Sequence, residues 1–176
     1  IYIPLYVTTI GDRAFWDCYH WIPSHYNAVN CTSMKTSYNG VYYSVFSSDE
    51  EGSPTRLTRV IVGNGVQYIP KYAFKDAVDV YQTLTIPASV QNIDDYAFYN
   101  TKVLELNILG NGLSRIGNYS FAYCKVLETH LNLPNSVTTV GNYAFYNCLR
   151  LQGVTFGEGI EVVGEYAFWN CPVLRS

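Results

Sequence analysis

Two cysteines and two histidines near the start of the chain are the residues whose types could bind a metal ion: Cys18, His20, His25 and Cys31. Thiolate and imidazole groups are the usual ligands of zinc. The intervals between the four residues match no standard zinc motif, and Cys18 belongs to a column of small residues described below. We therefore predict no metal site and no cofactor, and we interpret Cys31 as a lone thiol.

Motifs that would indicate catalysis or nucleic-acid binding are absent from the sequence. It contains no G-x-S-x-G, no H-E-x-x-H and no phosphate-binding loop. Only 14% of the residues are charged and the net charge is −3, whereas a nucleic-acid binder carries a basic face. No apolar run is long enough to span a membrane. We expect a protein that is not an enzyme, binds no nucleic acid and has no membrane span.

One sequence motif recurs along the chain and indicates the architecture. It is clearest at residues 89–98 (SVQNIDDYAF) and 136–145 (SVTTVGNYAF). The positions five, eight and twelve residues before the last phenylalanine of each copy are always apolar. Such columns predict the buried ladders of a solenoid, in which each repeat packs chiefly on its neighbours. The repeat phenylalanines are Phe15, Phe74, Phe98, Phe121, Phe145 and Phe168.

The same alignment predicts the local structure of each repeat. Residues 84–86 and 131–133 alternate with a period of two and stop before a proline, as short strands do. A second extended piece is expected at residues 90–93. Asp, Asn or Glu stands shortly before most of the repeat phenylalanines, which suits the first residue of a helix. We therefore predict about one helical turn over each Tyr-Ala-Phe run.

Four of the five cysteines follow the repeat phenylalanine by three residues: Cys18, Cys124, Cys148 and Cys171. Ala77 and Thr101 fill the same position in the other repeats, so this position requires a small side chain. We predict reduced thiols packed against the core.

The interval from Phe15 to Phe74 is longer than the others, which are all 23 or 24 residues. Proline-type and glycine-type turns alternate along the chain, and a hidden extra repeat would break that alternation. We therefore predict an insertion over residues 21–56 within one solenoid domain of residues 1–176. The insertion is expected to form a β-hairpin, with a strand at residues 40–46 that returns through residues 55–62.

The aligned columns resemble the leucine-rich repeats of the BspA-like (treponemal) type. The stretches TLTIPASVQNIDDYAF, HLNLPNSVTTVGNYAFYNC and VTFGEGIEVVGEYAFWNC carry this resemblance. It implies an α/β repeat solenoid, a right-handed stack of about six rungs of 23 or 24 residues, with short strands on the concave side and one-turn helices. Family members occur on the surfaces of bacteria and some protists and are associated with adhesion, and the resemblance does not imply an enzyme.

Two sets of residues are the candidate binding sites. The first set lies on the concave face that the resemblance implies. It consists of strand positions that alternate with the core positions: Arg59, Thr83, Thr85, His130, Asn132 and Thr155. The second is a row of aromatic residues directly after the repeat phenylalanine: Trp16, Tyr99, Tyr146 and Trp169. The aromatic row could stack against sugars or grip an apolar patch of a partner. The alternative is that these rings stack on one another and shield the core.

These observations favour a binding module of a surface or secreted protein that mediates adhesion or recognises a protein or glycan. The alternative is a structural scaffold or spacer subunit within a large intracellular assembly. The last rung stops at residues 173–176, where another strand should begin. We expect adjoining repeats or a partner at that C-terminal edge, because an open edge exposes unpaired backbone groups.

Overall fold

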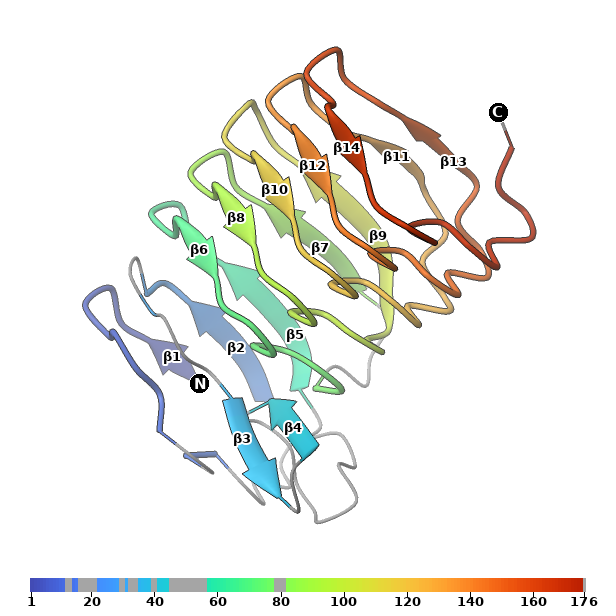
Figure 1. Ribbon diagram of the computed structural model, residues 1–176. Coiled ribbons are helices and arrows are strands. Elements are labelled where there is room, and N and C mark those ends of the chain that lie inside the picture. Colours follow the sequence, from blue (N-terminus) through green and yellow to red (C-terminus); the bar gives the residue numbers. More distant parts are fainter. Residues whose placement is uncertain are drawn as a thin grey trace.

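The computed structural model describes residues 1–11, 14–15, 22–28, 31, 35–38, 41–44, 57–77 and 82–175. The predictions made for Trp16, Cys18 and His20 fall outside these residues. Within the described part the chain forms strands and turns and no helix. It winds into a β-solenoid whose rungs follow one another from the N-terminal to the C-terminal end (Figure 1).

From β5 onward each of five rungs contributes two strands separated by a turn, and the second strand has two residues. The strands are β1 (Tyr2–Ile3), β2 (Ile22–Tyr26), β3 (Lys35–Tyr38), β4 (Val41–Ser44), β5 (Leu57–Val62), β6 (Tyr68–Ile69), β7 (Gln82–Ile86), β8 (Asn92–Ile93), β9 (Val103–Ile108), β10 (Arg115–Ile116), β11 (His130–Asn132), β12 (Thr139–Val140), β13 (Gly153–Thr155) and β14 (Val162–Val163).

The strands lie on two faces of the stack (Figure 1). On one face, β6, β8, β10, β12 and β14 form a single parallel sheet in the order of the chain. On the other face, the first strands of the rungs pair in parallel as β1-β2-β5, β7-β9 and β11-β13. We call the outward side of β5, β7, β9, β11 and β13 the first-strand face.

The core between the two faces consists of the predicted ladders. The rings of the repeat phenylalanines from Phe74 to Phe168 stack in one line, with centroids 5.2 or 5.3 Å apart. Four of them, from Phe74 to Phe145, are completely buried. Because burial of a large apolar side chain contributes about 1.5–3 kcal/mol, each rung gains its stability only when a neighbouring rung covers it.

The predicted helical turns are wrong, because the Tyr-Ala-Phe runs form successive β-turns. In one rung Ala144 N donates to Gly141 O, Tyr146 N to Tyr143 O, and Cys148 N to Phe145 O, each over 3.1–3.3 Å. These bonds join residues three apart, whereas an α-helix joins residues four apart. Tyr143 has φ 56° and Asn147 has φ 62°, and these positive values are incompatible with a right-handed helix.

The next rung explains why turns replace the helix. The alternate amides of the same run donate to backbone carbonyls of the following rung: Tyr143 N to Glu165 O (2.9 Å), Phe145 N to Ala167 O (2.8 Å) and Asn147 N to Trp169 O (3.0 Å). The Asn and Asp residues at the predicted helix starts also form hydrogen bonds between rungs. Asp95 Oδ1 accepts from Asn118 N, and Asn118 Oδ1 from Asn142 N, both at 2.8 Å. Every second amide therefore stabilises the stack and not a helix.

The predicted insertion begins too early, because β2 is part of the stack. It pairs in parallel with β1 on one side and with β5 on the other, and Tyr26 lies in register between Ile3 and Val62. A rung strand that the sequence pattern missed thus lies within residues 21–56. Tyr26 is fully buried and packs edge-on against Phe74, with centroids 5.9 Å apart. It therefore takes the place of an aliphatic residue in the core column.

A hairpin follows β2, but not between the predicted strands. β3 pairs antiparallel with β4, so that Tyr38 faces Val41. The predicted return strand, β5, pairs in parallel with β2 instead.

Candidate functional site

The first-strand face carries a row of exposed polar side chains. In β7 the residues alternate strictly, so that Gln82, Leu84 and Ile86 are buried whereas Thr83 and Thr85 are exposed. This alternation follows from the period of two in a strand that has the core on one side. The other predicted positions on this face, Arg59, His130, Asn132 and Thr155, are exposed as well.

Two polar residues of this face were missed by the sequence analysis. Glu105 and Asn107 of β9 are exposed and lie directly opposite Thr83 and Thr85. Thr83 Oγ1 donates to Glu105 Oε2 over 2.9 Å. The repeat pattern does not indicate them, because it assigns Leu109, twelve residues before Phe121, to the core column. Leu109 is 49% exposed, and Ile108 is the residue that pairs with Ile86.

His130 of β11 connects to β13 in the C-terminal part of the face. Its Nε2 lies 2.8 Å from Thr155 Oγ1, and Asn132 is in register with Thr155. A Cβ at Gly153 would collide with the His130 imidazole, so the ring lies over this glycine. Asn107, His130 and Asn132, together with Leu109, also line a shallow hollow of about 160 Å³ between β9 and β11.

Arg59 lies farther along the same face, in β5. β5 and β7 belong to separate sheets. The buried amide of Gln82 bridges them, because its Oε1 accepts a hydrogen bond of 2.9 Å from Val60 N. The structure thus brings Thr83 and Thr85 next to the residues of β9, and His130 and Asn132 next to Thr155. Arg59 is exposed on the same face, but it lies in the neighbouring sheet.

The predicted aromatic row exists from Tyr99 to Trp169, and Tyr123, which the sequence pattern missed, belongs to it. Successive rings from Tyr99 to Tyr146 are inclined to each other by 56° and 60°, whereas Tyr146 and Trp169 stack face to face. Tyr99, Tyr123, Tyr146 and Trp169 follow one another at centroid distances of 5.3 Å. A second row consists of Tyr72, Tyr96, Tyr119, Tyr143 and Tyr166, with neighbouring rings stacked 4.7–5.2 Å apart. Since a sugar stacks on the face of a ring, Tyr96, Tyr119 and Tyr143, which are stacked on both sides, offer only their edges. Trp169 and Tyr166 each stack on the ring of the preceding rung and are 53% and 52% exposed.

Two cysteines of the predicted column lie in the core and are not activated for reaction. Cys124 and Cys148 are free, buried thiols, and their Sγ atoms donate to Phe98 O and Phe121 O over 3.3 Å. Burial raises the pKa of Cys124 to about 11, and it raises the pKa of Cys148 well above the usual value. Neither thiol is activated as a nucleophile, because the thiolate is the reactive form.

The four residues considered for zinc are only partly described. His25 is exposed on β2, and Cys31 is buried. Within the described residues, no group of three or more His, Cys, Asp or Glu side chains could hold a metal ion. The same part of the chain contains no helix that is long and apolar enough to cross a membrane.

The repeat geometry agrees with a known family. Residues 52–175 match the model of the BspA type leucine rich repeat region in six copies. The chain belongs to this family. The BspA-type pattern thus covers the rungs from β5 to the last one, and the resemblance of the motifs to this family is confirmed.

Two solved structures share the fold of this BspA-type chain. One is a leucine rich cell surface protein from Faecalibacterium prausnitzii and the other a leucine-rich repeat protein from Bacteroides ovatus, each with a TM-score of 0.61 and 24% sequence identity. Both matches cover 99% of this chain but only 46% and 47% of the solved chains, so it spans about half their length. No curated protein matches the sequence significantly.

Proposed function

We propose that this chain is a non-enzymatic recognition module that binds a protein or glycan partner through the first-strand face. The observation that carries the proposal is the row of exposed polar side chains on parallel strands whose alternate residues are buried. Repeat solenoids use such extended faces for binding. The row varies from rung to rung, with Thr85, Asn107, Asn132 and Thr155 at successive positions.

Membership in the BspA-type family supports recognition over catalysis. The solved relative from Faecalibacterium prausnitzii is a cell surface protein. By analogy we propose that this chain works at the cell surface or as part of a secreted protein, in adhesion.

The first experiment is a binding screen. The purified chain is applied to arrays of extracellular proteins and of glycans, next to a variant with Asn132→Arg. We expect at least one partner that binds the wild-type chain and binds the variant at least tenfold more weakly, because a long charged side chain on the face blocks close contact. No bound partner, or partners that bind both proteins equally, would contradict the proposal.

A structural scaffold within an intracellular assembly is the second candidate function. Free buried thiols such as Cys124 favour it, because disulfides are rare in reducing compartments and no disulfide is present in the described residues. Antibody labelling of intact and then permeabilised source cells separates the two functions. Labelling of intact cells supports the recognition module. Labelling only after permeabilisation would rule out a role at the cell surface and support the scaffold.

A further inference from the structure

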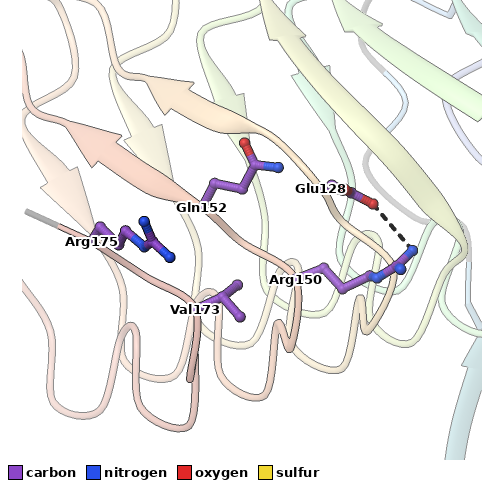
Figure 2. Close-up of a pocket in the computed structure, with 5 residues that line it drawn as sticks. All are labelled: Glu128, Arg150, Gln152, Val173 and Arg175. Atoms are coloured by element: carbon purple, nitrogen blue, oxygen red, sulfur yellow. Dashed lines mark ion pairs between the residues drawn. The ribbon is translucent and has the colours of Figure 1, made fainter.

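A second hollow lies at the C-terminal part of the first-strand face. It has a volume of about 380 Å³ and is lined by Glu128, Arg150, Gln152, Val173 and Arg175. Figure 2 shows that these side chains come from neighbouring rungs of the solenoid. Arg175 is held there by the backbone, since it bridges to Gly153 and its N–H donates to Gln152 O over 2.9 Å.

The hollow offers hydrogen-bond donors that the described part of the chain does not use. Arg150 Nη1 lies 3.1 Å from Glu128 Oε2, but these side chains are 59% and 43% exposed, and such a surface pair contributes little. A guanidinium has five N–H donors, so Arg150 keeps others available. Within the described residues, no hydrogen bond or ion pair engages the guanidinium of Arg175 or the side-chain amide of Gln152.

The polar row of the face leads directly into this hollow. His130, Gly153 and Arg175 occupy the same register position in three successive rungs. Gly153 has no side chain, and the imidazole of His130 occupies the space over it. On the opposite side Val173, which is exposed, provides an apolar wall. A ligand that crosses the face could therefore place one group in the hollow.

We propose that this hollow binds a carboxylate carried by an acidic segment of a protein partner. The planar guanidinium fork of arginine matches a carboxylate with two parallel hydrogen bonds, and the Gln152 amide can donate a further one. Val173 can pack against the methylene groups of a glutamate side chain. A protein segment is favoured over an acidic polysaccharide because none of the described residues that line the hollow is aromatic, so a sugar finds no ring there to stack on. This inference rests on the proposed function and names the chemistry of one end of the face.

Fluorescence anisotropy with a labelled oligoglutamate peptide tests the proposal. We expect the peptide to bind the wild-type chain, more weakly as salt is added, and an oligoglutamine peptide of the same length to bind at least tenfold more weakly. Arg175→Gln should weaken oligoglutamate binding about tenfold, whereas Arg175→Lys should weaken it less because the charge remains. Thermal unfolding of each variant checks that the solenoid is intact.

Lys71→Gln is the matched control, because it removes one positive charge at a distant rung. Lys71 is exposed and paired with Asp95 at 3.4 Å, and it does not line the hollow. Oligoglutamate affinity should stay within about twofold of wild type. Equal losses in Lys71→Gln and Arg175→Gln would overturn the proposal, since they would indicate general charge attraction.

Two further outcomes would overturn the inference. The first is the absence of oligoglutamate binding, and the second is Arg175-dependent binding of polygalacturonate without any binding of the peptide. Neither outcome contradicts the proposed function if partners from the arrays still bind in a manner that depends on Asn132. The two proposals therefore fail separately.

Discussion

The ring of Tyr119 lies parallel to that of Tyr143 in the next rung, with centroids 4.7 Å apart and planes inclined by 6°. Tyr96 stacks on its other side at 4.9 Å. Tyr119 holds this position with φ 54°, a value that costs a non-glycine residue about 1–2 kcal/mol. The stacked rings on both sides offset that backbone strain, and the same arrangement recurs in each rung from Tyr72 to Tyr166.

Two substitutions at Tyr119 separate stacking from backbone strain. Tyr119→Ala removes two stacked contacts of about 0.5–1.5 kcal/mol each and keeps the strain, so the free energy of unfolding should fall by about 1–3 kcal/mol. Tyr119→Gly loses the same contacts but relieves the strain, and we expect it to be about 1 kcal/mol more stable than the alanine variant. Urea denaturation measures both values. An alanine variant as stable as the glycine variant would contradict the positive φ.

The ladder of side chains between rungs gives a second prediction. Asn118 Oδ1 accepts from Asn142 N, and Asp95 Oδ1 performs the same function one rung earlier. Asn118→Ala should lower the free energy of unfolding by about 0.5–1.5 kcal/mol, because the amide of Asn142 loses its partner. Asn118→Asp keeps an acceptor and should cost less.

The rate of hydrogen exchange at the amide of Asn142 reports directly on its hydrogen bond to Asn118 Oδ1. We expect faster exchange in Asn118→Ala and nearly unchanged exchange in Asn118→Asp. The contact would be absent in solution if the two variants exchanged at the same rate.

The buried thiols predict a loss of stability at alkaline pH. Burial raises the pKa of Cys124 from 9.0 to about 11 in the folded chain. The native state thus favours the neutral thiol, and its contribution is complete below pH 9 and lost as the pH rises towards 11. Over that range the contribution of Cys124 should fall by on the order of 2 kcal/mol.

Cys124→Ala serves as the comparison, because Ala77 fills the same column in another rung. The free energy of unfolding of wild type and variant is measured by urea denaturation at several pH values between 9 and 11. The wild-type value should fall more steeply than that of the variant. Identical slopes would show that the Cys124 thiol keeps an ordinary pKa.

The core was largely predictable from the sequence because its columns repeat the same residue types. The line of phenylalanines and the period-two strand β7 lie where the pattern placed them. The turns were not predictable in this way, since Asn and Asp suit both a helix start and a turn with positive φ. Only the neighbouring rung, which accepts hydrogen bonds from Tyr143 and Phe145, decides between the two.

Two other differences between the sequence prediction and the structure have local causes. β2 escaped detection because it contains Pro23, and because its core residue is Tyr26, whose hydroxyl donates to Tyr68 O over 3.3 Å. Glu105 and Asn107 escaped because Ile108, and not Leu109, pairs with Ile86. The hollow around Arg175 depends on contacts between rungs, and no spacing within one repeat indicates it.

The affinity of the strongest array partner for three versions of the chain tests the central claim most directly. Surface plasmon resonance compares wild type, Asn132→Arg on the first-strand face and Ser114→Arg, an exposed position next to the opposite sheet. The account predicts that Asn132→Arg weakens binding at least tenfold and that Ser114→Arg leaves it unchanged. Unchanged binding by Asn132→Arg together with weaker binding by Ser114→Arg would contradict it, since the partner would then bind the opposite face.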